Sequence, residues 1–505
     1  MIFYSANKKS YYHFDWETYK NTYPILSYQG YSTKDEFWWH YIHIGELQGY
    51  LYFDINKINN VYKYDNDLTN KTIIQPEVNV NTNINTNINK TIIQPEVTIC
   101  PRKTIYYYVD FVTKHTNRTG IQVVTIYLAK QFLKCQEEFY IDIIFVKWNN
   151  KLLCLEPCNS DDIYYLFNYN ETDDLVNEIT YDNYSPIQNN FSRPLSNCIF
   201  FCPELTFPIY NDLPEKLKKY LSINNLKSIF ILYDIIPLIL PDYNCIREPF
   251  KLYMLHNLLH ANKIITISNF TKIEFIKYCQ QNNLYSFNFP IVENISLPHQ
   301  YRNKLKELST IHENKDENEN EQQFSNKITI LVPGTVEPRK QQLKLVKIFN
   351  SFLQNNSSVD VEMIIFGNVL AVLEEEINNE IEKSNGKIKY LGIINNEKLA
   401  ELYGKSTFSC FISQYEGFGF PIAESLWHGI PVLTSNFGSM LEISNCGGCY
   451  SINSHSDIEI YDALENLIKK PKIIQKLRSE INKNKFITWY DYCKSIYVEI
   501  LKEFN

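Results

Sequence analysis

One stretch near the C-terminus, SQYEGFGFPIAESLWHGIPVL from Ser413 to Leu433, constrains the fold more than any other. The apolar runs at its two ends are typical of short buried strands. Between them, Gly417 and Gly419 permit a sharp turn and the close approach of a ligand. Pro421 suits the first turn of a helix, and Gly429 suits the position after its end. The pattern predicts a strand–loop–helix–strand unit of an α/β fold with a parallel sheet.

Two glutamates flank this predicted turn. Glu416 lies in the loop, and Glu424 lies one turn into the predicted helix. In open α/β sheets, ligands bind beyond the carboxyl ends of the strands, close to helix N-termini. A carboxylate at such a place can accept two hydrogen bonds from the vicinal diol of a sugar. The alternative is that Glu424 complements the helix dipole and that Glu416 is a solvated loop charge.

A second segment of the same half predicts an anion site. The apolar run from Lys327 to Val332 is followed by the sequence PGTVEPRKQ. Pro338 predicts the start of a helix, which would place Arg339 and Lys340 in its first turn, where cations oppose the helix dipole. A bound diphosphate would compensate for this, and Gly334 would let the backbone approach it closely. The alternative is a solvated basic pair.

Both motifs resemble the donor site of retaining glycosyltransferase family 4. The resemblance rests on EGFGFPIAE, with the spacing Glu416-x7-Glu424, and on GTVEPRK. It implies the α/β fold called GT-B, in which two Rossmann-like domains face a cleft that holds a nucleotide sugar. It further implies that Glu416, a candidate catalytic residue, contacts the transferred sugar and that Glu424 contacts the ribose. The residues expected to bind the donor are then Gly334, Arg339, Lys340, Gly419 and Glu424.

The first half of the chain also has a Rossmann-like start. A strand is predicted over Ile105–Val112, and an amphipathic helix over Ile121–Lys134, without a dinucleotide-binding fingerprint. The segment YDIIPLILPDY resembles the acceptor side of the family's cleft, which makes Asp234 a candidate catalytic residue. The alternative is a strand-end aspartate that caps the next turn. Ser268 is expected to cap a helix rather than to contact a ligand.

The chain divides into six predicted segments. NKTIIQPEV occurs twice around an Asn/Thr/Ile-rich tract, which indicates a low-complexity linker. The aromatic region before it resembles a small helical module attached to some bacterial and viral glycosyltransferases. The segments are the module at 1–55, the linker at 56–100, an acceptor domain at 101–305, an acidic flexible loop at 306–326, a nucleotide-sugar domain at 327–485, and a helix crossing back at 486–505.

Composition indicates a soluble, multidomain protein. The chain has 505 residues, 44% hydrophobic and 21% charged, with a net charge of −8, which gives no nucleic-acid footprint. The N-terminus has no apolar core of a signal peptide, and the longest apolar stretch, Ile229–Leu240, contains Asp234 and Pro237. We therefore expect no transmembrane segment and a cytoplasmic, non-secreted protein (host cytoplasm if viral), with peripheral membrane contact left open.

The twelve cysteines permit two other readings. Cys154-x3-Cys158 and Cys198-x3-Cys202 have spacings compatible with a zinc site, although CIFFC has the pattern of an apolar strand. Cys446-Gly-Gly-Cys449 has the spacing of a redox dithiol but follows no redox-type βαβ start. We expect neither a metal nor a redox centre.

The function expected from the resemblance is a metal-independent, retaining transfer of a hexose of the mannose, rhamnose or glucose type. The donor would be a nucleotide-diphosphate sugar, the acceptor a glycan or another hydroxyl compound, and no further cofactor would take part. One alternative is a non-catalytic carbohydrate-binding or scaffold protein derived from such an enzyme. A metal-dependent GT-A transferase would need the motif Asp65-Asn-Asp67, which lies in the low-complexity linker and is discounted.

Overall fold

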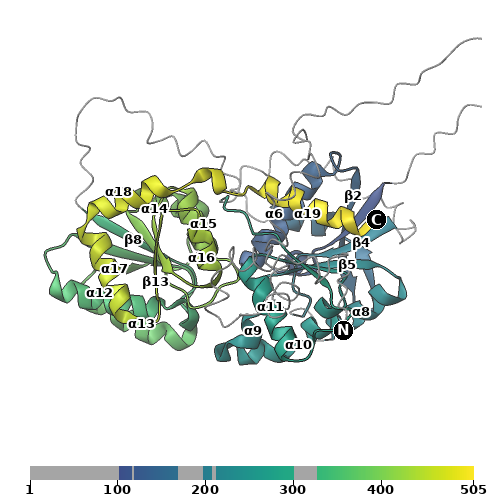
Figure 1. Cartoon of the computed structure of the whole chain (residues 1–505), viewed down its shortest axis with the longest axis horizontal. Coiled ribbons are helices and arrows are strands. Elements are labelled where there is room, and N and C mark those ends of the chain that lie inside the picture. The colour runs from purple at the N-terminus through teal and green to yellow at the C-terminus, as the bar shows by residue number, and fades with distance from the viewer. Residues whose placement is uncertain (1–101, 116–118, 169–196, 208–211, 301–326, 505) are drawn as a thin grey trace, which may run out of the picture. The chain divides into compact units, whose positions relative to one another are not determined.

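The computed structural model describes residues 102–115, 119–168, 197–207, 212–300 and 327–504. The aromatic module predicted at 1–55, the linker at 56–100 and the acidic loop at 306–326 lie outside these residues. Figure 1 shows the described residues as two sheets with helices packed on both (Figure 1). Among the described helices, none combines the length and the apolar character required to span a bilayer.

The first sheet contains seven strands within the described residues, in the order β3-β2-β1-β4-β5-β6-β7. All neighbours are parallel except β2 and β3, which are antiparallel. Its central strands are buried on both faces, as expected of a parallel sheet covered by helices. The strands are β1 (Lys103–Tyr108), β2 (Ile141–Asn149), β3 (Cys154–Pro157), β4 (Cys198–Cys202), β5 (Lys227–Leu232), β6 (Lys263–Thr266) and β7 (Ile291–Asn294).

The helices of this domain follow its strands in alternation. The predicted strand over Ile105–Val112 is too long, because the strand ends at Tyr108 and a short helix begins at Asp110. The Glu204 carboxylate accepts hydrogen bonds from the backbone N–H groups of Phe111 and Val112, at 2.8 and 3.0 Å, and so holds this turn. The helices are α5 (Asp110–Lys114), α6 (Gly120–Cys135), α7 (Ser160–Asn168), α8 (Leu213–Ile223), α9 (Ile236–Ile239), α10 (Asn244–His256) and α11 (Asn269–Gln281).

The second sheet contains six parallel strands within the described residues, in the order β10-β9-β8-β11-β12-β13. The strand order reverses between β8 and β11, so that the loops after these two strands meet at a topological switch point. The strands are β8 (Ile328–Pro333), β9 (Val361–Phe366), β10 (Ile388–Tyr390), β11 (Phe408–Phe411), β12 (Val432–Ser435) and β13 (Cys449–Ile452).

The helices of the second domain pack on both faces of its sheet, and the last helix of the chain packs elsewhere. That helix, α19, lies alongside α6 of the first domain, where the Tyr497 hydroxyl donates to the carbonyl oxygen of Phe132 at 2.8 Å (Figure 1). The helices are α12 (Gln342–Asn355), α13 (Ala371–Lys383), α14 (Asn396–Lys405), α15 (Phe420–Trp427), α16 (Gly438–Ser444), α17 (Asp457–Lys469), α18 (Pro471–Glu480) and α19 (Trp489–Phe504).

One hydrophobic core continues from the first domain into the second. Val124 of α6 and Tyr233 beyond β5 belong to the same buried cluster as Phe418 and Ile422 of the second domain, and as Trp489 of α19. Burial of each large apolar side chain contributes about 1.5–3 kcal/mol. The two domains are therefore held together by apolar packing as well as by the polar contacts of the site described next.

Candidate functional site

The loop after β8 carries the predicted anion-binding residues. Gly334 has a left-handed backbone with φ of 98°, as expected where the chain turns sharply. Arg339 and Lys340 lie in a 3₁₀ turn, Pro338–Lys340, and not in the first turn of the following α-helix as predicted. The helix α12 begins only at Gln342, because Gln341 adopts a left-handed conformation with φ of 58° that interrupts it. The two cations are thus removed from the N-terminal turn of α12.

The loop after β11 carries the predicted sugar-binding residues. Gly419, with φ of 112°, precedes α15 in the N-cap position. Gly417 was expected to let a ligand approach, but its close neighbour is the first domain, because a Cβ atom there would lie 2.0 Å from the carbonyl oxygen of Tyr233. Ser268 accepts a hydrogen bond from the backbone N–H of Thr271, the expected cap, and also donates to the carbonyl oxygen of Gly417 at 2.6 Å.

Arg339 is surrounded by protein acceptors. Its Nη1 lies 2.5 Å from Glu416 Oε1 and its Nη2 lies 2.8 Å from Glu337 Oε1. Nη1 also donates to the carbonyl oxygen of Tyr415 at 2.8 Å, and Nε donates to the hydroxyl of Tyr243 at 2.9 Å. Only 12% of the Arg339 side chain is exposed. Burial opposes its charge, but Glu416 and Glu337 raise the pKa of Arg339 above its ordinary value.

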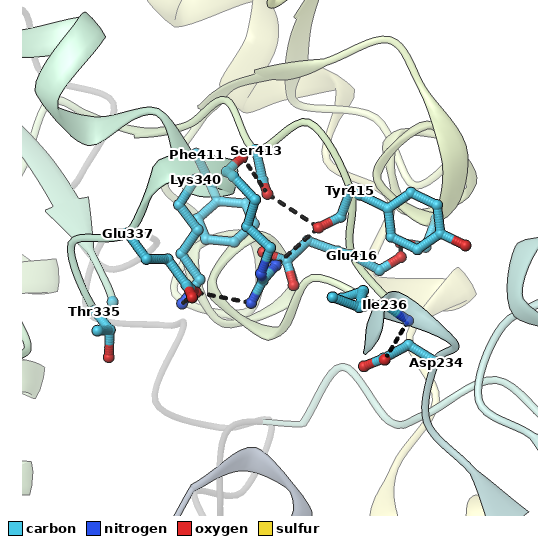
Figure 2. A network of polar contacts seen from close by, with 12 residues as sticks. Asp234, Ile236, Thr335, Glu337, Lys340, Phe411, Ser413, Tyr415 and Glu416 are labelled. Atoms are coloured by element: carbon cyan, nitrogen blue, oxygen red, sulfur yellow. Dashed lines mark hydrogen bonds and ion pairs between the residues drawn. The ribbon is translucent and has the colours of Figure 1, made fainter. Parts of the chain in front are cut away.

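Lys340 is held less tightly than Arg339. Its Nζ lies 3.2 Å from Glu337 Oε1. Figure 2 shows the side chains of Glu337, Lys340 and Glu416 close together, with Asp234 at the edge of the group. Burial would raise the pKa of Glu337, but Arg339 and Lys340 hold it below its ordinary value. Gly334 leaves room for the Lys340 side chain, since a Cβ atom at position 334 would lie only 3.2 Å from Lys340 Nζ.

Asp234 enters the site from the first domain. It follows β5 and accepts a hydrogen bond from the backbone N–H of Ile236 at 2.9 Å, as the turn-capping alternative predicted (Figure 2). Burial raises the pKa of Asp234 to about 6, although the neighbouring Arg339 guanidinium lowers it. Its carboxylate also lines the cavity, so the capping role and a role towards a ligand do not exclude each other.

A single cavity of about 520 Å³ joins these residues. Its volume falls within the usual range for small-molecule sites. Glu424 lines it from α15, where its Oε2 accepts a weak hydrogen bond from the Tyr403 hydroxyl at 3.5 Å. The predicted residues that line this cavity are Asp234, Arg339, Lys340, Glu416, Gly419 and Glu424. Gly334 is not part of its lining, but it lies next to the Lys340 side chain, which is.

Two residues of the site were not predicted from the sequence. Glu337 precedes Pro338 directly in the motif, a position that marks it as a neighbour of the two cations. Tyr243 comes from the first domain, and its hydroxyl donates to Glu337 Oε2 at 2.6 Å. Nothing in the surrounding sequence singles out Tyr243, because its partners lie about ninety residues away in the chain. Such a contact becomes visible only in the folded protein.

The structure shows where the cysteines of the zinc and redox alternatives lie. Cys198 and Cys202 lie buried at the two ends of β4, and Cys446 is a buried free thiol 3.4 Å from His299 Nε2. Within the described residues, no three His, Cys, Asp or Glu side chains form a group that would hold a metal ion. The buried cysteines of this part of the chain pack as small apolar residues.

Comparison with known proteins finds a family model that matches part of the chain. Residues 314–486 match the family described as Glycosyl transferases group 1. The chain is 34% identical over 121 residues to O-antigen chain mannosyltransferase B of Escherichia coli, which is 23% of this chain and 30% of that protein. It is 24% identical over 192 residues to a probable sucrose-phosphate synthase of Thermosipho melanesiensis, 37% of this chain and 43% of that protein. The chain thus spans less than half the length of these relatives.

Solved structures match over both domains. The Anabaena HepE protein in complex with UDP and glucose matches with a TM-score of 0.50 at 13% identity, over 79% of this chain and 100% of that one. The N-terminal domain of Candida albicans trehalose-6-phosphate phosphatase matches with a TM-score of 0.52 at 13% identity, over 81% of this chain and 98% of that one. The predicted fold class, GT-B with two Rossmann-like domains, is therefore confirmed.

Proposed function

We propose that this protein transfers a hexose from a nucleotide-diphosphate sugar to a hydroxyl acceptor, with retention of the anomeric configuration and without a metal ion. One observation carries the proposal: Lys340, Glu416, Glu424 and Asp234, from three loops and two domains, line the same cavity. The family match of residues 314–486 and the similarity to mannosyltransferases support a hexose donor, with mannose tested first.

The diphosphate is the leaving group in this reaction. Breaking the bond between the sugar and the phosphate oxygen leaves negative charge on the diphosphate, and a preorganised cation stabilises this charge in the transition state. Lys340 is the better placed of the two predicted cations, because Arg339 already has two carboxylates, a hydroxyl and a carbonyl oxygen as partners. The N-terminus of α15, beginning at Phe420, adds backbone N–H groups on the same side of the cavity.

The carboxylates position the sugar donor and the acceptor. Glu424 accepts hydrogen bonds from the ribose diol, and Glu416, held by Arg339, faces the transferred sugar. Asp234 lies beside the acceptor hydroxyl, whose oxygen attacks the anomeric carbon on the face that the diphosphate leaves. The hydroxyl proton passes to a departing phosphate oxygen, so that the products are the glycoside and the nucleoside diphosphate.

A panel of nucleotide sugars tests this proposal directly. The purified protein and the variant Glu424→Gln are incubated with each donor, with and without a chelator, and release of nucleoside diphosphate is followed. We expect one donor to be turned over regardless of the chelator, with a clear loss in the variant, and NMR of the product to show retention. Turnover that the chelator abolishes would refute metal independence. No turnover of any donor would favour a carbohydrate-binding or scaffold protein.

A further inference from the structure

A second, smaller cavity of about 190 Å³ adjoins the donor cavity on the side of the first domain. The two cavities share a wall that includes Asp234, Glu337 and Arg339. Away from this wall, the apolar residues that line the smaller cavity are Leu205, Phe207, Ile236, Pro237, Ile246 and Phe250. A group bound there would be directly beside the carboxylate at which we place the acceptor hydroxyl.

Apart from Asp234, at which we place the reacting hydroxyl, the polar side chains of this cavity are already engaged by the protein. The Tyr243 hydroxyl donates to Glu337 at 2.6 Å and accepts from Arg339 Nε at 2.9 Å. The Tyr233 hydroxyl donates to the carbonyl oxygen of Pro203 at 2.6 Å. The hydroxyls of a sugar ring in this cavity, other than one that reaches Asp234, would lose their water without gaining side-chain partners, which is unfavourable. An apolar group, in contrast, would gain by leaving water for this lining.

We infer that the acceptor carries a compact apolar group, about the size of one ring, next to its reacting hydroxyl, and that this group occupies the smaller cavity. The inference rests on the proposed function, because Asp234 fixes where the reacting hydroxyl lies. The volume sets the size of the group, since cavities that hold whole drug-sized ligands start at about 300 Å³. The aromatic faces of Phe207, Tyr243 and Phe250 suit a planar ring.

Calorimetric binding of matched glycosides tests the inference without requiring turnover. The probes are the methyl, phenyl and n-octyl mannosides and glucosides, together with mannobiose and maltose, each added to the full-length protein in the presence of UDP or GDP. We expect one phenyl hexoside to bind at least about tenfold more tightly than its methyl counterpart, because a ring buried on apolar walls leaves water. The octyl hexoside should gain no more than the phenyl hexoside.

Two variants on the same helix identify the cavity. Ile246 of α10 lines it and is 37% exposed, whereas Leu252 of α10 is 41% exposed and lies outside it. Ile246→Asp should abolish the preference for the phenyl hexoside, and Leu252→Asp should preserve it. The thermal midpoint of both variants is measured to verify that each is folded.

Each other outcome overturns the inference. Equal affinity for methyl and phenyl hexosides, or tighter binding of the disaccharides, would show that the cavity takes a hydroxylated group or none. Affinity that rises from phenyl to octyl would indicate an extended chain. A phenyl preference that survives Ile246→Asp would place the ring elsewhere. If the phenyl preference is found but no donor is turned over, the proposed function fails while the apolar site stands. If a donor is turned over but phenyl and methyl hexosides bind equally, the apolar site fails while the proposed function stands.

Discussion

Arg339 and Lys340 are adjacent in sequence, but we predict that replacing Arg339 mainly lowers stability, whereas replacing Lys340 mainly weakens nucleotide binding. Arg339→Ala would leave the carboxylate of Glu416, which is 12% exposed, without its cation at 2.5 Å, and would take one cation from Glu337. Removing one partner of a buried ion pair costs about 3–5 kcal/mol. Because Lys340 still faces Glu337, we expect the lower value, about 3 kcal/mol, which lowers the thermal midpoint by about 4 °C in a cooperative unit of this size.

Lys340→Ala should leave stability almost unchanged and weaken nucleotide binding. Its Nζ forms an ion pair with Glu337 at 3.2 Å, but Glu337 keeps Arg339 at 2.8 Å, so the loss of Lys340 leaves no buried carboxylate unpaired and should cost only about 1 kcal/mol. A charge-assisted contact with a diphosphate is worth about 1.5–3 kcal/mol, so its loss should weaken binding of UDP or GDP by about 10–150-fold. Lys347→Ala, which removes an exposed ion pair between Lys347 of α12 and Glu376 of α13, is the matched control for both measurements.

Differential scanning fluorimetry and isothermal titration calorimetry on the same preparations separate the two effects. The double variant Arg339→Met/Glu416→Gln should recover part of the stability lost in Arg339→Met, because no unpaired charge remains at that position. The reasoning is refuted if Arg339→Ala keeps the wild-type midpoint, or if Lys340→Ala binds nucleotide as tightly as the Lys347→Ala control does.

Three further predictions concern the contacts between the domains. Gly417→Ala should lower kcat by about 100-fold, because its Cβ would lie 2.0 Å from the carbonyl oxygen of Tyr233, whereas Gly404→Ala, with open space around it, should keep wild-type kcat. The raised pKa of Asp234, about 6, means that the native protein holds an extra proton between about pH 4 and 6, so stability falls as pH rises through this window. Asp234→Asn should therefore gain up to about 2 kcal/mol at pH 7.5 and less at pH 5, and a pH-independent difference in thermal midpoint would contradict this. Tyr243→Phe should cost about 1–3 kcal/mol, measured by thermal midpoint, because a buried carboxylate loses its hydroxyl donor; an unchanged midpoint would show that this bond contributes nothing.

The sequence was sufficient to predict the GT-B fold and the loops that surround the cavity. Short apolar runs, glycines and helix-initiating prolines are local signals, and they predicted the strand–loop–helix pattern around β11 and α15. The left-handed residue Gln341 was missed, because Gln is not among the residue types, such as Gly and Asn, that commonly adopt this conformation.

Two of the partners of Arg339 had no such local signal. Glu416 and Tyr243 lie 77 and 96 residues away, and they reach Arg339 only because two loops of the second sheet and one turn of the first domain converge. The sequence therefore indicated a free cation where the structure has an ion-paired one. The same reason explains the short helix α5, whose N–H groups are held by Glu204, more than ninety residues further along the chain.

The loop after β11, which carries Glu416 and Gly417, is held by hydrogen bonds from the first domain. The carbonyl oxygen of Gly417 accepts from the Ser268 hydroxyl at 2.6 Å and from the Thr271 hydroxyl at 3.2 Å. Glu442 of α16 accepts from the backbone N–H of Asn269 at 3.0 Å, so a side chain of the second domain caps helix α11 of the first. Because Glu416 precedes Gly417 directly, a movement between the domains would displace the carboxylate that we propose contacts the transferred sugar. We therefore expect the relative position of the domains to be coupled to donor placement, so that acceptor binding to the first domain should strengthen donor binding to the second.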